Sequence, residues 1–210
     1  MNTLVHSYLF LRRAVGVLGI SLPIVVIAGK EILQGGGLFG SLSGYYYSDL
    51  RNVFVGTLCA IGVFLVSYRG YGRLDDFVST VAAVAGVGVA LFPTSPVAPT
   101  PAEHAIGVAH LVLAGIFFLS LAFFCLFLFT KTDGTPTPRK RSRNVVYRAC
   151  GVVMLASLVL IAVNAAFFNA QTVSVHPTVW LESLAVLAFG VAWLVKGETL
   201  LADPPQASRP

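Results

Sequence analysis

Charged residues are scarce in this chain, where Asp, Glu, Lys and Arg together make up 11% of 210 residues. A soluble domain carries about 25%. Hydrophobic residues make up 56%, more than one soluble core can hide, so lipid must be part of the solvent. The net charge of +5 does not indicate nucleic-acid binding, because the basic residues lie in short loops between apolar runs, where they set membrane topology.

Motifs of several common enzyme classes are absent as well. The chain has no Gly-x-Ser-x-Gly elbow, no P-loop and no Gly-x-Gly-x-x-Gly after a strand, which argues against serine hydrolases and nucleotide-binding enzymes. Cys59, Cys125 and Cys150 have no CxxC or metal-ligand spacing, so we expect inert thiols among apolar residues. No inverted repeat or pair of broken helices is visible, which disfavours a secondary transporter.

Long apolar runs are what the chain does contain. A transmembrane helix needs about 20 apolar residues, with a range of roughly 17–25. The sequence predicts an all-α, polytopic membrane protein, a bundle of six transmembrane helices in a single domain over residues 1–201. The six spans are about 11–29, 51–68, 77–92, 104–130, 145–168 and 177–195. Residues 202–210, rich in Pro and Ser, are expected to form a disordered cytoplasmic tail.

The distribution of Lys and Arg predicts the orientation of these spans. With the N-terminus inside, twelve basic residues are cytoplasmic and two are outside, which is the bias of the positive-inside rule. Both termini are then cytoplasmic, in a multi-pass protein of the plasma or inner membrane. The inner set is Arg12, Arg13, Arg69, Arg73, Lys131, Arg139, Lys140, Arg141, Arg143, Arg148, Lys196 and Arg209, and the outer set is Lys30 and Arg51.

Two further features bear on the boundaries of the spans. Arg12-Arg13 followed by an apolar run resembles a signal peptide, but Lys30-Glu31 would be a poor start for a mature protein, so we expect the first helix to be retained. Trp180 and Trp193 are thirteen residues apart, about 20 Å along a helix. This spacing predicts one belt tryptophan near each membrane interface.

Polar residues at membrane depth gather towards the outer side in this topology. Glu182 is the sharpest case, because an ionisable group in hydrocarbon costs at least ~2.5–3.5 kcal/mol and is rarely there without a role. It must be protonated or paired, and a bond to Arg51 or Asn164 that locks two helices together is one interpretation. An acid that faces a cavity is the other. Glu103 and His110 are seven residues apart, two turns along one helix face.

The stretch 41–52, with three tyrosines, three serines, Asp49 and Arg51, precedes the second span and is interpreted as a loop over a site. Asp49 or Ser48 alternatively caps that span. We predict one outer-leaflet pocket built from the following residues. Candidate catalytic residues are Glu182, Asp49, His110 and Glu103, and candidate substrate-binding residues are Tyr45, Tyr46, Tyr47, Arg51, Asn52, Asn164, Phe168, His176 and Trp180.

A carboxylic acid among aromatic walls suits protonation-initiated chemistry on a hydrophobic lipid or isoprenoid, because aromatic faces stabilise cations. We therefore expect a membrane enzyme of the cyclase or isomerase type, with the bilayer and a hydrophobic substrate as its partners and no cofactor. One alternative is a non-catalytic membrane scaffold or accessory protein. Another is a metal-dependent lipid hydrolase, in which zinc would bind His104, His110 and His176, although no HxxxH or HExxH spacing supports it.

Two stretches carry a resemblance to a family. Ser41–Gly56 and Trp180–Glu198 resemble a family of uncharacterised bacterial multi-span membrane proteins, and the likeness covers most of the chain. This resemblance implies the fold but supplies no activity. The size and hydropathy also resemble the plan of the integral membrane terpene cyclases. An alkaline-ceramidase-like hydrolase would need a His-x-x-x-His pair late in the chain, where only His176 is present.

Overall fold

The structure, a computed structural model, describes residues 3–132, 134–168, 171 and 174–202. These residues form helices joined by short loops, and none of them lies in a strand. The predicted tail falls, apart from Ala202, outside the described residues. In chain order the elements are α1 (Thr3–Leu33), η1 (Ser43–Tyr47), α2 (Arg51–Ser67), α3 (Arg73–Leu91), α4 (Pro101–Phe123), η2 (Phe124–Leu128), α5 (Pro138–Val163), η3 (Asn164–Phe168) and α7 (Pro177–Lys196).

The helices coincide with the apolar segments expected from the sequence. Five helical stretches are long and apolar enough to cross a membrane, and α2 is apolar but has 17 residues. The structure thus confirms an all-helical membrane protein. The five stretches are Tyr8–Leu33, Arg73–Leu91, Pro101–Leu128, Pro138–Phe168 and Pro177–Lys196.

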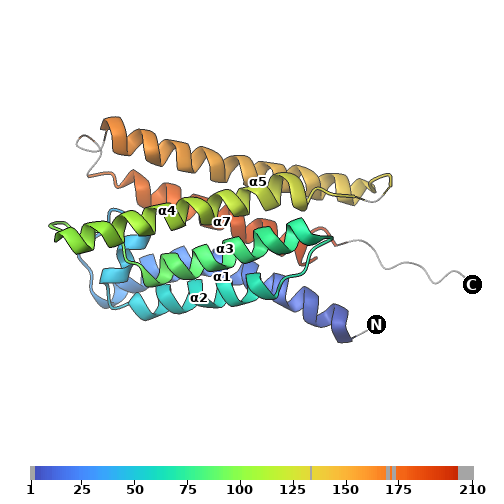
Figure 1. The fold of residues 1–210 in the computed structure, drawn as a ribbon, viewed down its shortest axis with the longest axis horizontal. Coiled ribbons are helices and arrows are strands. Elements are labelled where there is room, and N and C mark those ends of the chain that lie inside the picture. The colour runs from blue at the N-terminus through green and yellow to red at the C-terminus, as the bar shows by residue number, and fades with distance from the viewer. Residues whose placement is uncertain (1–2, 133, 169–170, 172–173, 203–210) are drawn as a thin grey trace, which may run out of the picture.

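Successive helices run in alternating directions along one axis (Figure 1). The start of α1, the α2–α3 turn, the α4–α5 loop and the end of α7 meet at one end of the bundle (Figure 1). We call it the basic end, after Arg12, Lys131, Lys140, Arg143 and Lys196. The opposite end, which we call the tyrosine end, carries η1 and the segment 41–52 (Figure 1).

Local signals explain where several helices begin. Thr100 and Glu103 form a capping box at the start of α4, in which each side chain accepts the other residue's backbone N–H. Thr137 caps α5 by accepting the N–H of Lys140. Proline occupies the first position of α4, α5 and α7, where its missing N–H leaves no helical hydrogen bond unmade.

The end of α7 is set by backbone geometry. Glu198 adopts a left-handed conformation, with φ of 56°. Its N–H donates to the carbonyl of Val195, and the N–H of Thr199 donates to the carbonyl of Leu194. This is a Schellman motif, which satisfies the last carbonyls of a helix. It leaves Lys196 in the last turn, where a cation is favoured by the helix dipole.

Small residues let the helices approach closely. A Cβ added to Gly190 of α7 would lie 2.8 Å from the backbone nitrogen of Ile20 and 2.9 Å from the carbonyl oxygen of Gly16, both in α1. Gly86 of α3 lies against Phe117 of α4, and Ala82 and Ala90, four residues to either side of it, are fully buried. Close backbone packing of this kind stabilises helix association in lipid, where the hydrophobic effect does not drive helices together.

Trp193 corrects one expectation. Its indole is 1% exposed and lies in an aromatic cluster, with ring centroids 5.2 Å from Tyr68, 5.3 Å from Phe129 and 6.0 Å from Phe124. The prediction of a second belt tryptophan is therefore wrong, because the indole fills the space where α2, η2 and α7 meet. Trp180 is 52% exposed, as expected of a belt residue.

Candidate functional site

Glu182, in the second turn of α7, accepts hydrogen bonds from backbone N–H groups of the tyrosine end. Its Oε2 accepts the N–H of Leu42 at 2.5 Å and the N–H of Ser43 at 3.3 Å. These amides belong to the first turn of η1, whose N-cap residue Leu42 makes no capping bond through its own side chain. Since the first amides of a helix lack internal partners, Glu182 serves as an N-cap supplied from a distant part of the chain.

Glu182 also lines a small cavity with apolar walls. Its lining residues come from α1, α2, α3, α4, η1 and α7, and they include Phe54, Phe117 and Phe118. The cavity volume is about 40 Å³, which is room for a few water molecules. A lipid or isoprenoid chain does not fit unless the segment above it moves.

The three predicted tyrosines hold the tyrosine end together in three different ways. Tyr45 is fully buried and packs edge-on against Phe39, with ring centroids 5.1 Å apart. The Tyr46 ring lies 4.1 Å from the guanidinium carbon of Arg51, which also donates to its hydroxyl. Tyr47 donates to the carbonyl of Thr94 at 2.7 Å. Burial raises the pKa of Tyr45 and of Tyr47 above the usual phenol value, so both stay neutral.

Of the partners considered for Glu182, Arg51 is engaged elsewhere. The Arg51 guanidinium interacts with Tyr46, while backbone amides hold the carboxylate. Ser48, not Asp49, interacts with the start of α2, because its hydroxyl accepts the N–H of Leu50 at 3.1 Å. The Asp49 side chain is exposed.

Glu103 and His110 are each engaged locally. Glu103 is exposed and binds the N–H and hydroxyl of Thr100, both at 2.8 Å. His110 is 3% exposed, and its Nδ1 lies 2.6 Å from the carbonyl oxygen of Phe92. Both interactions stabilise the α3–α4 connection, and no described residue is a partner of both side chains.

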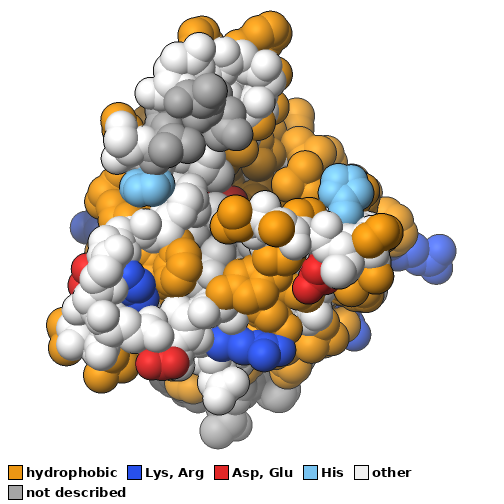
Figure 2. All heavy atoms as spheres, turned by 90° about the vertical axis from the view of Figure 1, so that its left-hand side faces the viewer, with side chains coloured by type: hydrophobic (Ala, Val, Ile, Leu, Met, Phe, Trp, Pro, Cys, Tyr) orange, Lys and Arg blue, Asp and Glu red, His pale blue; other side chains and the backbone are white. Residues whose placement is uncertain are grey.

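The remaining predicted residues are spread over the tyrosine end. Asn52, Phe168 and Trp180 are exposed, and Asn164 and His176 are half-buried. Figure 2 shows this face, on which histidine side chains lie on opposite sides and do not meet. Within the described ranges, no three His, Cys, Asp or Glu side chains form a group that could hold a metal. Of the thirteen predicted site residues, Glu182 is the one that lines the cavity.

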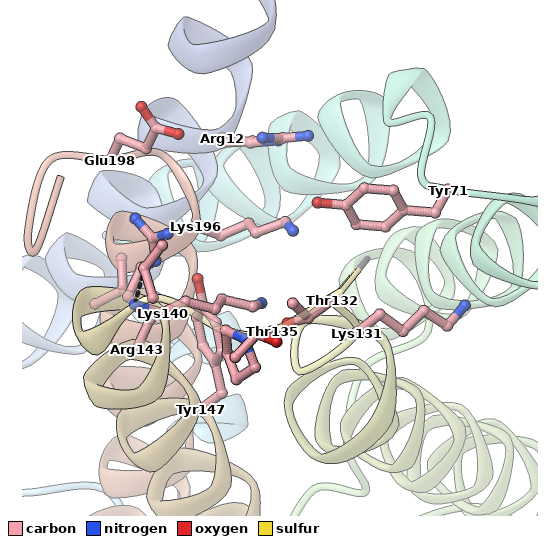
Figure 3. Close-up of a pocket in the computed structure, with 13 residues that line it drawn as sticks. Arg12, Tyr71, Lys131, Thr132, Thr135, Lys140, Arg143, Tyr147, Lys196 and Glu198 are labelled. Carbon is pink, nitrogen blue, oxygen red and sulfur yellow. Dashed lines mark hydrogen bonds between the residues drawn. The ribbon is translucent and has the colours of Figure 1, made fainter. Parts of the chain in front are cut away.

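A larger pocket lies at the basic end, where the sequence analysis placed no site. The pocket has a volume of about 330 Å³, within the usual range for small-molecule sites, and Figure 3 shows the residues that line it. Five basic side chains and one acid line it. These are Arg12 from α1, Lys131 from the α4–α5 loop, Lys140 and Arg143 from α5, Lys196 from α7 and Glu198 from the turn that follows.

Lys196 is the central residue of this basic pocket. The residue is 7% exposed, and its Nζ lies 4.9 Å from the ring centre of Tyr71 and 5.2 Å from that of Phe129. No carboxylate of the described chain lies within salt-bridge distance of it. Its ammonium reaches into the space that Tyr71 closes from the other side (Figure 3). A buried ammonium is costly unless an anion or hydrogen bonds compensate it.

Arg12 is held in place by aromatic rings. Its guanidinium carbon lies 5.1 Å from the ring centre of Tyr8 and 5.5 Å from that of Tyr68. Its Nε is buried and has no hydrogen-bond partner among the residues that the structure describes. The Tyr8 hydroxyl is fixed in turn by the carbonyl of Arg69 at 2.7 Å. Arg12 therefore has a defined orientation and unused donors.

The wall opposite Lys196 is formed by the start of α5. Thr135, Pro136, Thr137 and Lys140 line the pocket there, and a helix N-terminus carries a partial positive charge. Lys140 donates to the carbonyl of Phe129 at 2.7 Å. This wall adds hydroxyl groups and a favourable dipole to a site that is already positive.

Lys131 lines the same pocket but points out of it (Figure 3). Its Nζ lies 2.7 Å from Oδ2 of Asp75, a carboxylate at the start of α3 that is 0% exposed. The pair ties the α4–α5 loop to α3. Oδ1 of Asp75 has no hydrogen-bond partner, so Asp75 depends on Lys131 for compensation.

The sequence analysis identified these basic residues but did not predict that they line one pocket. All five basic residues belong to the cytoplasmic set, and each was explained by its contribution to topology. A count of charges cannot tell which of twelve side chains face one another. The available signal was Lys196, a lysine at the end of an apolar helix with no acid one turn before it.

Comparison with protein-family models, curated proteins and solved structures finds no match for this chain. The geometry of the two ends is thus the basis on which a function is assigned.

Proposed function

We propose that this protein is a six-span membrane protein that binds a phosphate-type anion in the pocket at its basic end. Lys196 carries the proposal. A lysine that is 93% buried, without a carboxylate partner in the described chain and directed into a cavity, matches a site that an anion completes. Arg12 and the start of α5 supply further donors, and both groups suit phosphate oxygens.

The six spans and their orientation belong to the same proposal. The twelve-to-two distribution of basic residues supports cytoplasmic termini, with α2 as the sixth span. The basic pocket then lies at the cytoplasmic interface. We expect reporter fusions after Thr135 and after Pro210 both to give a cytoplasmic signal. An extracytoplasmic signal from either fusion would contradict this orientation.

The anion-binding proposal is tested with the purified full chain in detergent. We expect inorganic pyrophosphate to raise the melting temperature, because a ligand that binds only the folded state stabilises it by RT ln(1 + [L]/Kd). At a hundred times Kd this is about 2.7 kcal/mol, or roughly 5–11 °C for a chain of this size. Sodium chloride at equal ionic strength is the control. An equal shift with both salts would contradict a specific site.

A second candidate function concerns the tyrosine end. Glu182 lies on an apolar cavity with three phenylalanines, which favours the proposed acid chemistry on an isoprenoid or lipid. The cavity is small, so this proposal requires the segment above Glu182 to open. Lipid extracts of cells that express wild type should then contain a product that is missing with Glu182→Gln. Identical extracts from both would leave Glu182 with its capping role alone.

A further inference from the structure

The number of cations directed into the basic pocket bears on the charge of its ligand. Arg12 and Lys196 come from opposite ends of the chain, and neither has a carboxylate partner among the described residues. Their nearest recorded contacts are the faces of aromatic rings. Aromatic faces orient a cation but leave its formal charge in place. At least two positive charges are therefore presented together, and Lys140 and Arg143 line the same pocket.

The other acidic groups nearby do not neutralise this pair. Asp75 is bound to Lys131, on the side that faces away from the pocket. Glu198 is exposed, and its carboxylate points away from Lys196 in Figure 3. A ligand with two or more negative charges therefore suits the site better than a singly charged one.

Phosphate groups differ in this property. A phosphate monoester carries about −1.5 to −2 charges at pH 7 and has three terminal oxygens. A phosphodiester, which is the group in most membrane phospholipids, carries one charge on two free oxygens. The monoester matches both cations, whereas the diester leaves one of them uncompensated in a buried site.

From this geometry we infer that the basic pocket selects a phosphate monoester or diphosphate group over a phosphodiester. The inference rests on the anion-binding function proposed above and specifies its ligand. The same group occurs on lipids such as phosphatidic acid and on small soluble phosphates. Tyr71, 65% exposed at the pocket rim, and Tyr147, on the α5 side, supply two hydroxyls for the third oxygen.

Binding of four probes to the full chain in phosphatidylcholine nanodiscs tests the inference. The probes are phosphatidic acid, phosphatidylglycerol, glycerol 3-phosphate and pyrophosphate, and each is measured with wild type, Lys196→Met, Arg12→Met and Arg73→Gln. Arg73 is exposed at the same end of the bundle and does not line the pocket. Its replacement by glutamine removes the same charge as the two pocket variants. We expect phosphatidic acid to bind at least tenfold more tightly than phosphatidylglycerol. Both pocket variants should reduce this preference at least fivefold, and Arg73→Gln should keep it.

The possible outcomes distinguish the selectivity for a phosphate monoester from the proposed anion binding itself. Tight binding of glycerol 3-phosphate or pyrophosphate, with none of phosphatidic acid, supports a soluble monoester or diphosphate as the ligand. Equal binding of phosphatidylglycerol and phosphatidic acid that still depends on Lys196 overturns the monoester inference and keeps the anion site. Binding that is the same in all variants, or absent for all four probes, overturns both.

Discussion

Replacing Lys196 by methionine is expected to weaken the response to pyrophosphate without destabilising the unliganded protein. A charged hydrogen bond contributes about 1.5–3 kcal/mol, so the affinity should fall roughly tenfold to a hundredfold. At a pyrophosphate concentration of a hundred times the wild-type Kd, the stabilisation should then fall to about half of the wild-type value for a tenfold loss of affinity and to about 15% for a hundredfold loss.

The unliganded Lys196→Met protein should be at least as stable as wild type. Methionine has a similar length and can pack on the rings of Tyr71 and Phe129 that lie beside the lysine. Burial of an ion costs several kcal/mol, whereas cation–π contacts return about 0.5–2 kcal/mol each and the helix dipole less than about 1 kcal/mol. Opposite effects on stability and on ligand response are typical of a binding residue.

Thermal unfolding with and without pyrophosphate measures both effects. Arg73→Gln, which removes one positive charge outside the pocket, should retain the wild-type ligand response. A Lys196→Met protein that melts much earlier than wild type, yet still responds fully to pyrophosphate, would show that Lys196 has a structural role instead.

Replacing Glu182 by alanine should loosen the tyrosine end. The change leaves the N–H groups of Leu42 and Ser43 without their acceptor, and an unsatisfied buried amide costs about 1–3 kcal/mol. With two amides affected, one of them at the longer distance of 3.3 Å, we expect a loss of ~2–4 kcal/mol. This corresponds to a melting temperature lower by roughly 5–15 °C.

Glu182→Gln distinguishes the hydrogen bonds from the charge. The amide oxygen of glutamine still accepts from the two N–H groups, so the loss should be about 1–1.5 kcal/mol, the difference between a hydrogen bond to a charged group and a neutral one. Limited proteolysis between residues 34 and 50 should accelerate in the alanine variant first. Asp49→Asn, at an exposed side chain in the same segment, is the matched control. Equal melting temperatures for Glu182→Ala and wild type would contradict the capping role.

The two ends of the bundle show why site residues were harder to predict than helices. Rarity of charge in apolar runs drew attention to Glu182, and the structure does place it on a cavity. The rarity of polar residues in apolar runs also selected His110, whose buried ring interacts through Nδ1 with the carbonyl oxygen of Phe92. This criterion did not select Lys196, because a lysine at the end of a membrane helix is common.

Sequence alone determined the helices of this protein. Each hydrogen bond of a membrane helix joins residues close in the chain, so apolar runs, prolines and caps such as Thr100–Glu103 define them without knowledge of the fold. Tertiary structure decided which side chains meet. The rotation of each helix about its axis and the path of the loops decide whether Glu182 contacts Arg51 or the amides of η1. They also decide whether Arg12 and Lys196 line the same pocket. That rotation is set by the close contacts of small residues such as Gly190 with α1, across more than 160 residues of sequence.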